Sequence, residues 1–210
     1  MPGASFVESW KRLTADLGCD AAAAEAVGAE LLERHLEAGR HYHRVEHIEA
    51  VLRHLDTLDA ATPVTRFAAF FHDAIYDATA GDNEEQSARL AIERLTSLGI
   101  DAAAINDVAA IIRATAGHVL PPDPLPGMAA FLDADLAILG AELDVYRAYA
   151  VAIRQEYAHM SDDDFRDGRA QVLVHFAERD DLYFTGAGRA LWDAQARENL
   201  RRELIELQAH

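Results

Sequence analysis

An apolar run from Phe67 to Phe71 leads directly into a histidine and an aspartate, His72 and Asp73. A second aspartate, Asp77, follows four residues later. Ionisable groups this close to an apolar segment are costly to remove from water unless a partner compensates their charge. A bound divalent cation is one such partner, and imidazole together with carboxylate suits manganese, iron, zinc or magnesium. The pattern therefore indicates a metal site at the His-Asp pair.

Further candidate ligands flank this pair on both sides. Upstream, His43 and His47 are four residues apart, so they share one face if the segment is helical. Downstream, Asp133 and Asp135 lie within the apolar run 131–136. Each of these groups stands on an apolar segment of its own. We therefore predict that separate helices pack together and bring their polar groups to a common cation.

The elements that must position these residues are expected to be helices. Alanine, leucine, glutamate and arginine abound, and no segment alternates apolar with polar residues as a half-buried strand would. Thr62-Pro63 is a typical helix start and opens the helix that ends at the His-Asp pair. Helices are expected over residues 5–17, 20–37, 43–58, 63–72, 82–98, 101–115, 128–139, 142–158, 162–179 and 187–208. We predict a single all-α domain over residues 1–210.

Four segments carry the motif residues: HYHRVEHI at 41–48, FHDAIYD at 71–77, DNEEQSA at 82–88 and DADL at 133–136. As a set they resemble the HD superfamily of metal-dependent phosphohydrolases, in particular an uncharacterised branch of about this length. The resemblance implies a single-domain HD-type helical bundle that hydrolyses a small phosphate ester or anhydride, such as a nucleotide. One alternative is a metal- or nucleotide-binding regulatory protein without turnover. Another is a helical scaffold in which these side chains only form core hydrogen bonds.

The resemblance implies one divalent metal ion (manganese, iron, zinc, magnesium or similar) with four ligands: His47, His72, Asp73 and Asp135. The family motifs favour His47 over His43 and Asp135 over Asp133. His43 is then left to ligate, to orient a ligand or to contact substrate. Asp133 then either accepts a hydrogen bond from one of the ligand residues or faces solvent. Only His118 lies between the His-Asp pair and the last motif as a further histidine, so one metal is expected rather than two.

Metal-assisted hydrolysis also needs a group that takes or relays a proton, and three carboxylates are candidates: Asp73, Asp77 and Glu84. Asp77 completes a His-Asp-x-x-x-Asp order that is similar to the hydrolase site of the stringent-response nucleotide pyrophosphohydrolases. Glu84 opens the next helix beside the same expected pocket. Alternatively, Glu84 only stabilises the helix by interacting with its dipole, as acidic residues in a first turn do.

Phosphate recognition must use arginine, histidine, backbone N–H groups or metal, because Lys11 is the only lysine. The candidate substrate-binding residues are His43, Arg44, His118, Arg154 and Arg169, with Arg113 as a further arginine to test. Arg169 lies among apolar residues of its helix, and a buried arginine needs a partner. That partner is either the substrate or an internal carboxylate, Glu156 or Asp133.

The formal net charge of −17 argues against a nucleic-acid polymer or an anionic membrane as partner. It argues only weakly against a small phosphorylated substrate, because a metal reverses the local potential. The single Cys19 excludes an internal disulfide and fits a reducing compartment. We see no secretory signal, and no apolar run approaches the ~20 residues of a membrane span. We expect a cytoplasmic protein, and a homodimer is left open.

Overall fold

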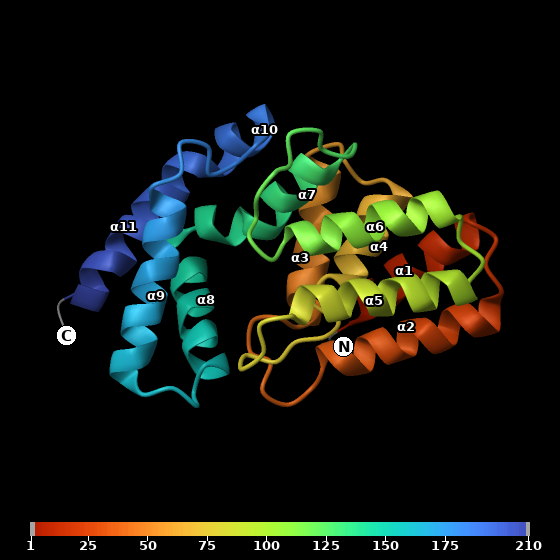
Figure 1. Ribbon diagram of the computed structural model, residues 1–210, viewed down its shortest axis with the longest axis horizontal. Helices are drawn as coiled ribbons and strands as arrows, with labels where there is room; N and C mark the ends of the chain where they lie inside the picture. The colour runs from red at the N-terminus through yellow and green to blue at the C-terminus, as the bar shows by residue number, and fades with distance from the viewer. Residues whose placement is uncertain (1–2, 209–210) are drawn as a thin grey trace.

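The computed structural model describes residues 3–208, which form a helical bundle (Figure 1). In chain order the elements are α1 (Ala4–Asp16), α2 (Ala21–His35), α3 (Val45–Thr57), α4 (Pro63–Phe71), α5 (Asn83–Ser97), α6 (Ala102–Ala114), α7 (Met128–Asp135), the 3-10 helix η1 (Leu136–Gly140), α8 (Leu143–Glu156), α9 (Asp162–Ala177), α10 (Gly186–Gly188), the π-helix η2 (Arg189–Asp193) and α11 (Ala194–Gln208). No strand occurs within residues 3–208. The predicted all-α fold class is confirmed.

Three helix boundaries near the candidate site differ from those expected from the sequence. α3 begins at Val45 with Arg44 as its N-cap, so His43 lies in the preceding loop and not on the helical face of His47. The expected helix 128–139 changes from α to 3-10 geometry after Asp135. The expected helix 187–208 is divided into α10, η2 and α11.

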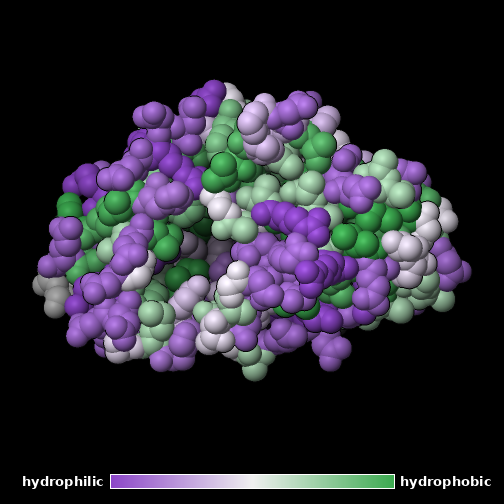
Figure 2. Space-filling view, in the orientation of Figure 1, coloured by the Kyte–Doolittle hydropathy of each residue, from purple (hydrophilic) through white to green (hydrophobic). Residues whose placement is uncertain are grey.

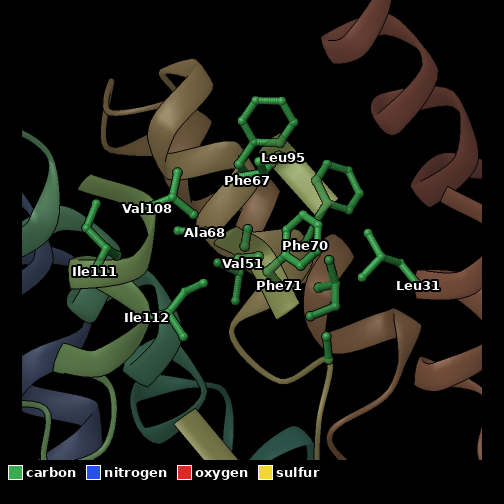
Figure 3. Packing of buried hydrophobic residues seen from close by; sticks show 14 of the residues in the cluster. Leu31, Val51, Phe67, Ala68, Phe70, Phe71, Leu95, Val108, Ile111 and Ile112 are labelled. Carbon is green, nitrogen blue, oxygen red and sulfur yellow. The ribbon is translucent and has the colours of Figure 1, made fainter. Parts of the chain in front are cut away.

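The larger hydrophobic cluster belongs to α1–α7, here called the N-terminal lobe (Figure 3). α4 contacts α3, α5, α6 and α7, and it starts at a capping box in which Thr62 and Thr65 bond reciprocally. Phe70 is fully buried and meets the rings of Phe6 and Trp10 edge to face, at centroid distances of 4.9 and 5.1 Å. Removing such a ring typically costs about 3–5 kcal/mol. This packing fixes the end of α4, where the His-Asp pair begins.

A second hydrophobic cluster joins η1, α8, α9 and α11, here called the C-terminal lobe, on the left of Figure 1. Arg169 is buried within it and donates to Glu203, with Nε 2.8 Å from Oε1. The hydroxyl of Tyr146 also donates to Glu203. A buried charge pair of this kind is stable only when its remaining polar atoms are bonded, as they are here. In residues 3–208, none of the helices combines the length and apolarity needed to cross a bilayer.

His35, at the end of α2, should make the stability of the protein depend on pH. It is fully buried, and its Nε2 donates to the carbonyl oxygen of Phe70 at 3.2 Å. Burial lowers the pKa of His35 from 6.5 to about 3. As the pH falls, the imidazole of His35 is therefore protonated in the unfolded chain before it is protonated in the folded protein. The stability that is complete above the unfolded pKa is lost as the pH falls toward 3. Between pH 7 and pH 5 we expect the free energy of unfolding to drop by about 2 kcal/mol through this residue.

Urea unfolding at both pH values measures this effect. The variant His35→Phe should lose about 2 kcal/mol of the pH dependence. The variant His159→Gln, which changes an exposed histidine, should retain it. An unchanged pH dependence in His35→Phe would show that the buried imidazole is not the titrating group.

Candidate metal centre

Four side chains converge where the two lobes adjoin. His47 comes from the first turn of α3, His72 and Asp73 from the end of α4, and Asp135 from the end of α7. The Nε2 atoms of His47 and His72 lie 3.1 Å apart. Asp73 Oδ2 lies 3.1 Å from His72 Nε2 and 3.5 Å from His47 Nε2. Asp135 Oδ1 lies 3.4 and 3.0 Å from the same two nitrogen atoms.

The separations among His47, His72 and Asp73 match those of atoms that share one cation. Ligand atoms about 2.0–2.2 Å from a metal, at angles near 90–110°, are roughly 3.0–3.5 Å from each other. These three residues form a group that could hold a metal ion, because one ligand atom of each lies within 4.8 Å of the others. Asp135 is close to both histidines but is not part of this group. His72 Nδ1 donates to the carbonyl oxygen of Ala69 at 3.0 Å, so a neutral His72 has its lone pair on Nε2. That lone pair lies near two carboxylates and the Nε2 of His47, an arrangement that a proton or a metal ion stabilises.

The electrostatics of the cluster favour cation binding. Burial would raise the pKa of Asp73, but the charges of His72 and His43 outweigh it and hold the pKa far below its usual range. Burial likewise would raise the pKa of Asp135, which the His72 charge and a hydrogen bond from His118 instead lower. Against its own burial, the pKa of His72 is raised by the same two carboxylates. A metal must displace the His72 proton, so metal affinity should fall as the pH falls.

His118 holds the second oxygen of Asp135, with Nε2 2.9 Å from Oδ2. The backbone of His118 is in the left-handed region, at φ 46°. For a residue other than glycine this conformation costs of the order of 1–3 kcal/mol. Arg179 stabilises it by donating to the carbonyl oxygens of Gly117 and His118 at 2.7 Å each. Arg179 follows α9, so the C-terminal lobe helps to orient Asp135 through His118.

Replacing His118 with phenylalanine is expected to weaken divalent-metal binding roughly 10–100-fold, because partners that orient a ligand typically have effects of this size. Calorimetric titration of the metal-free protein with zinc or manganese measures the affinity. The control is His159→Phe, a change of an exposed histidine that should leave the affinity unaltered. Equal affinities in both variants would show that the His118 contact does not position Asp135.

Glu156, the last residue of α8, organises the loop before α3, and the sequence did not mark it as a site residue. Its Oε1 accepts the backbone N–H groups of His41, Tyr42 and His43 at 2.7, 2.7 and 3.0 Å. Its Oε2 accepts His43 Nδ1 at 2.7 Å and the Tyr76 hydroxyl at 2.8 Å. These bonds explain why residues 41–43 form a loop and not the start of α3. They also fix the orientation of the His43 ring, which stacks on Tyr76 at 4.2 Å.

Among the carboxylates predicted from the sequence, Asp77 is not brought to the cluster. Its carboxylate accepts the backbone N–H and the hydroxyl of Thr79 at 2.8 and 2.7 Å in an exposed loop. Glu84 is half-buried and lines the same cavity as Asp73.

Asp133 was expected either to bond to a ligand residue or to face solvent. It is buried, so the second expectation is wrong. Its carboxylate accepts the backbone N–H groups of Phe184 and Thr185 at 2.7 and 2.8 Å, and also the Thr185 hydroxyl. It therefore anchors the segment before α10 and does not support a metal ligand.

Most of the predicted phosphate-binding arginines are engaged elsewhere. Arg169 pairs with Glu203 and not with either of the carboxylates expected as its internal partner. Arg154 donates to the carbonyl oxygen of Tyr157 at 2.8 Å and to Asp162 at 2.7 Å. Arg113 pairs with Glu85. Among these candidates, Arg44 alone lines a cavity that reaches the metal ligands.

Two cavities open on the cluster. The apolar cavity, of about 570 Å³, is lined by His47 and Asp135 together with Val51, Ala137 and Trp192. The acidic cavity, of about 430 Å³, is lined by Asp73, Glu84, His118 and again Asp135. Figure 2 shows the molecule hollowed between the two lobes. Both cavities are large enough for a small organic phosphate.

Comparisons of the chain with protein-family models, with curated proteins and with solved structures find no match in any of the three. The resemblance to the HD superfamily therefore rests on the sequence motifs. The structure adds a helical fold and a group of two buried histidines and a half-buried aspartate that could hold a metal ion.

Proposed function

We propose that this protein is a metal-dependent phosphohydrolase that acts on a small phosphate ester or anhydride, such as a nucleotide. The proposal is carried by the convergence of four side chains beside two cavities: His47, His72, Asp73 and Asp135. Their donor set suits manganese, iron, zinc or magnesium. A divalent cation held there supplies Lewis-acid polarisation of a phosphoryl oxygen and lowers the pKa of water. The motifs shared with the HD phosphohydrolases support the same reaction.

The remaining tasks fall to side chains of the acidic cavity and its surroundings. Glu84 lines the same cavity as Asp73 and takes the proton of the attacking water. His43 donates its Nδ1–H to Glu156. Burial would lower the pKa of His43, but the charge of Asp73 and this hydrogen bond raise it. In the protonated ring, Nε2–H donates to a substrate oxygen. Arg44 lines the other cavity and contributes positive charge for the phosphate.

A metal- or nucleotide-binding protein without turnover is the second candidate. It is favoured by the engagement of Arg154 and Arg169 in internal bonds, which leaves little positive charge for a phosphate in its transition state. The placement of Asp77 in an exposed loop also removes one expected proton acceptor.

Phosphate release from a panel of monoesters, diesters and nucleotides tests the proposal, with protein that is stripped and then reloaded with each metal. We expect release with at least one metal, and its loss in Asp73→Asn. The variant Glu84→Gln should bind metal like the wild type but release phosphate roughly 10²–10⁴-fold more slowly. If metal binds normally and no substrate is hydrolysed, the binding function replaces the catalytic one.

A further inference from the structure

The apolar and acidic cavities meet at the metal ligands but differ in chemistry. Small and branched aliphatic side chains from α3, η1 and α8 line the apolar cavity, among them Val51, Ala137, Ile138 and Ala152. Carboxylates and other polar groups line much of the acidic cavity. Asp135 lines both, so a phosphoryl group held at the cluster has access to either side.

Aromatic rings enclose part of the apolar cavity. Tyr42 and Tyr149, which line both cavities, meet at a centroid distance of 4.6 Å. Trp192 of η2 packs against His54 of α3 at 5.2 Å, which brings the two lobes together across the cavity. Half-buried rings of this kind offer flat apolar surface to a ligand with a planar group.

Positive charge is also unequally distributed. Arg44 and Arg53 both line the apolar cavity, together with the carboxylates of Glu46 and Asp135, and Arg44 lies 3.9 Å from Glu46. Among the described residues that line the acidic cavity, none is arginine or lysine, while Asp73 and Glu84 are both present. An anionic organic phosphate is therefore repelled less on the apolar side, where arginines balance the carboxylates, than on the acidic side.

We propose that the apolar cavity binds the leaving group of the substrate and selects organic phosphates with a flat, uncharged and predominantly apolar group, such as an aryl ring. This assignment rests on the proposed phosphohydrolase function. In phosphoryl transfer the attacking and leaving oxygens lie roughly in line, on opposite sides of the phosphorus. The acidic cavity, with Glu84 to take a proton, then receives the water, and the leaving group occupies the other side. Polyol groups are disfavoured where they meet the part of the wall formed by Val51, Ala137 and Ala152, because these side chains offer no hydrogen bonds.

Binding of phenylphosphonate, which has no scissile ester bond, tests the cavity without turnover. The zinc-loaded protein should bind phenylphosphonate at least roughly 10-fold more tightly than methylphosphonate, because only the phenyl ring reaches the apolar wall. Calorimetry measures both affinities. Quenching of Trp192 fluorescence reports the position of the ring, since the other tryptophan, Trp10, is buried in the N-terminal lobe. In Trp192→Phe the quenching should disappear.

A matched pair of substitutions tests the location. Ala152→Leu places a larger side chain in the wall of the apolar cavity and should weaken phenylphosphonate binding roughly 10-fold, with methylphosphonate unaffected. Ala103→Leu makes the same change at an exposed position of α6, outside both cavities, and should alter neither affinity. Equal affinity for the two phosphonates, or equal effects of the two substitutions, would overturn the proposal.

Hydrolysis separates this proposal from the proposed function. Phenolate is intrinsically a better leaving group than an alkoxide, so the rates of the two esters are not compared with each other. Each ester is instead compared between the wild type and Ala152→Leu, which should lower kcat/KM for phenyl phosphate but not for glycerol 2-phosphate. If phenylphosphonate binds as expected and no ester is hydrolysed, the cavity assignment stands and the phosphohydrolase function fails. If esters are hydrolysed equally well by wild type and Ala152→Leu, the function stands and the cavity assignment fails.

Discussion

Replacing Asp73 with asparagine is expected to weaken divalent-metal binding by more than roughly 100-fold, since even partners that only orient a ligand contribute 10–100-fold. The amide keeps the shape of the side chain but removes a negative charge from a buried cluster. It also leaves His72 Nε2 without the carboxylate oxygen that lies 3.1 Å away. Calorimetric titration of the metal-free protein with zinc or manganese measures the loss.

Asp77→Asn provides the control, because it makes the same chemical change four residues later in an exposed carboxylate. The Asp77 side chain bonds to Thr79, so this variant should bind metal like the wild type. A wild-type affinity in Asp73→Asn, or an equal loss in both variants, would contradict a metal centre at the end of α4.

The parts of the fold that were predictable are those with local causes. Thr62-Pro63 and the apolar run after it define α4 through a cap, a fixed backbone angle and burial, all of which act within a few residues. Asp77 was predicted from the His-Asp-x-x-x-Asp order, in which it follows Asp73 by four residues. A spacing of four residues predicts a shared face only while a helix continues, and α4 ends at Phe71. His43 has the same explanation, because α3 begins only at Val45.

The contributions of Glu156 and Glu203 depend on contacts that are distant in sequence. Glu156 accepts hydrogen bonds from residues 41–43, which precede it by 113 to 115 positions in the sequence. Three of these donors are backbone N–H groups, which leave no pattern in the sequence. Arg169 was expected to need a partner, but the chain has 36 acidic residues, and only the packing of α9 on α11 selects Glu203. Local patterns therefore predict which groups are buried more reliably than which groups they meet.

Glu156 and Arg179 give the C-terminal lobe a role in the site although it contributes none of the four candidate ligands. Glu156 fixes the loop that carries His43, and Arg179 fixes the turn that carries His118. Both contacts cross from the C-terminal lobe to loops of the N-terminal lobe. The relative position of the two lobes is therefore expected to set the geometry of the cluster.

Replacing Glu156 with alanine is expected to lower the free energy of unfolding by about 3–5 kcal/mol, as when one partner of a buried charge pair is removed. The substitution leaves the N–H groups of residues 41–43, the His43 ring and the Tyr76 hydroxyl without their acceptor. Urea unfolding near pH 7 measures the change. Gln155→Ala, at the exposed neighbouring position, should stay within about 0.5 kcal/mol of the wild type. A similarly small effect in Glu156→Ala would show that this carboxylate does not hold the loop.

Glu156→Gln separates the charge of this side chain from its shape. Burial would raise the pKa of Glu156, but the hydrogen bond and charge of His43 and the backbone N–H groups outweigh it and lower the pKa from 4.5 to about 2. Because the pKa is lower in the folded state, the stabilisation is complete above the unfolded value of about 4.5 and is lost as the pH falls toward 2. The difference in unfolding free energy between wild type and Glu156→Gln should therefore shrink across this window. A difference that stays constant from pH 5 to pH 2.5 would mean that the oxygen atoms, and not the charge, hold the loop.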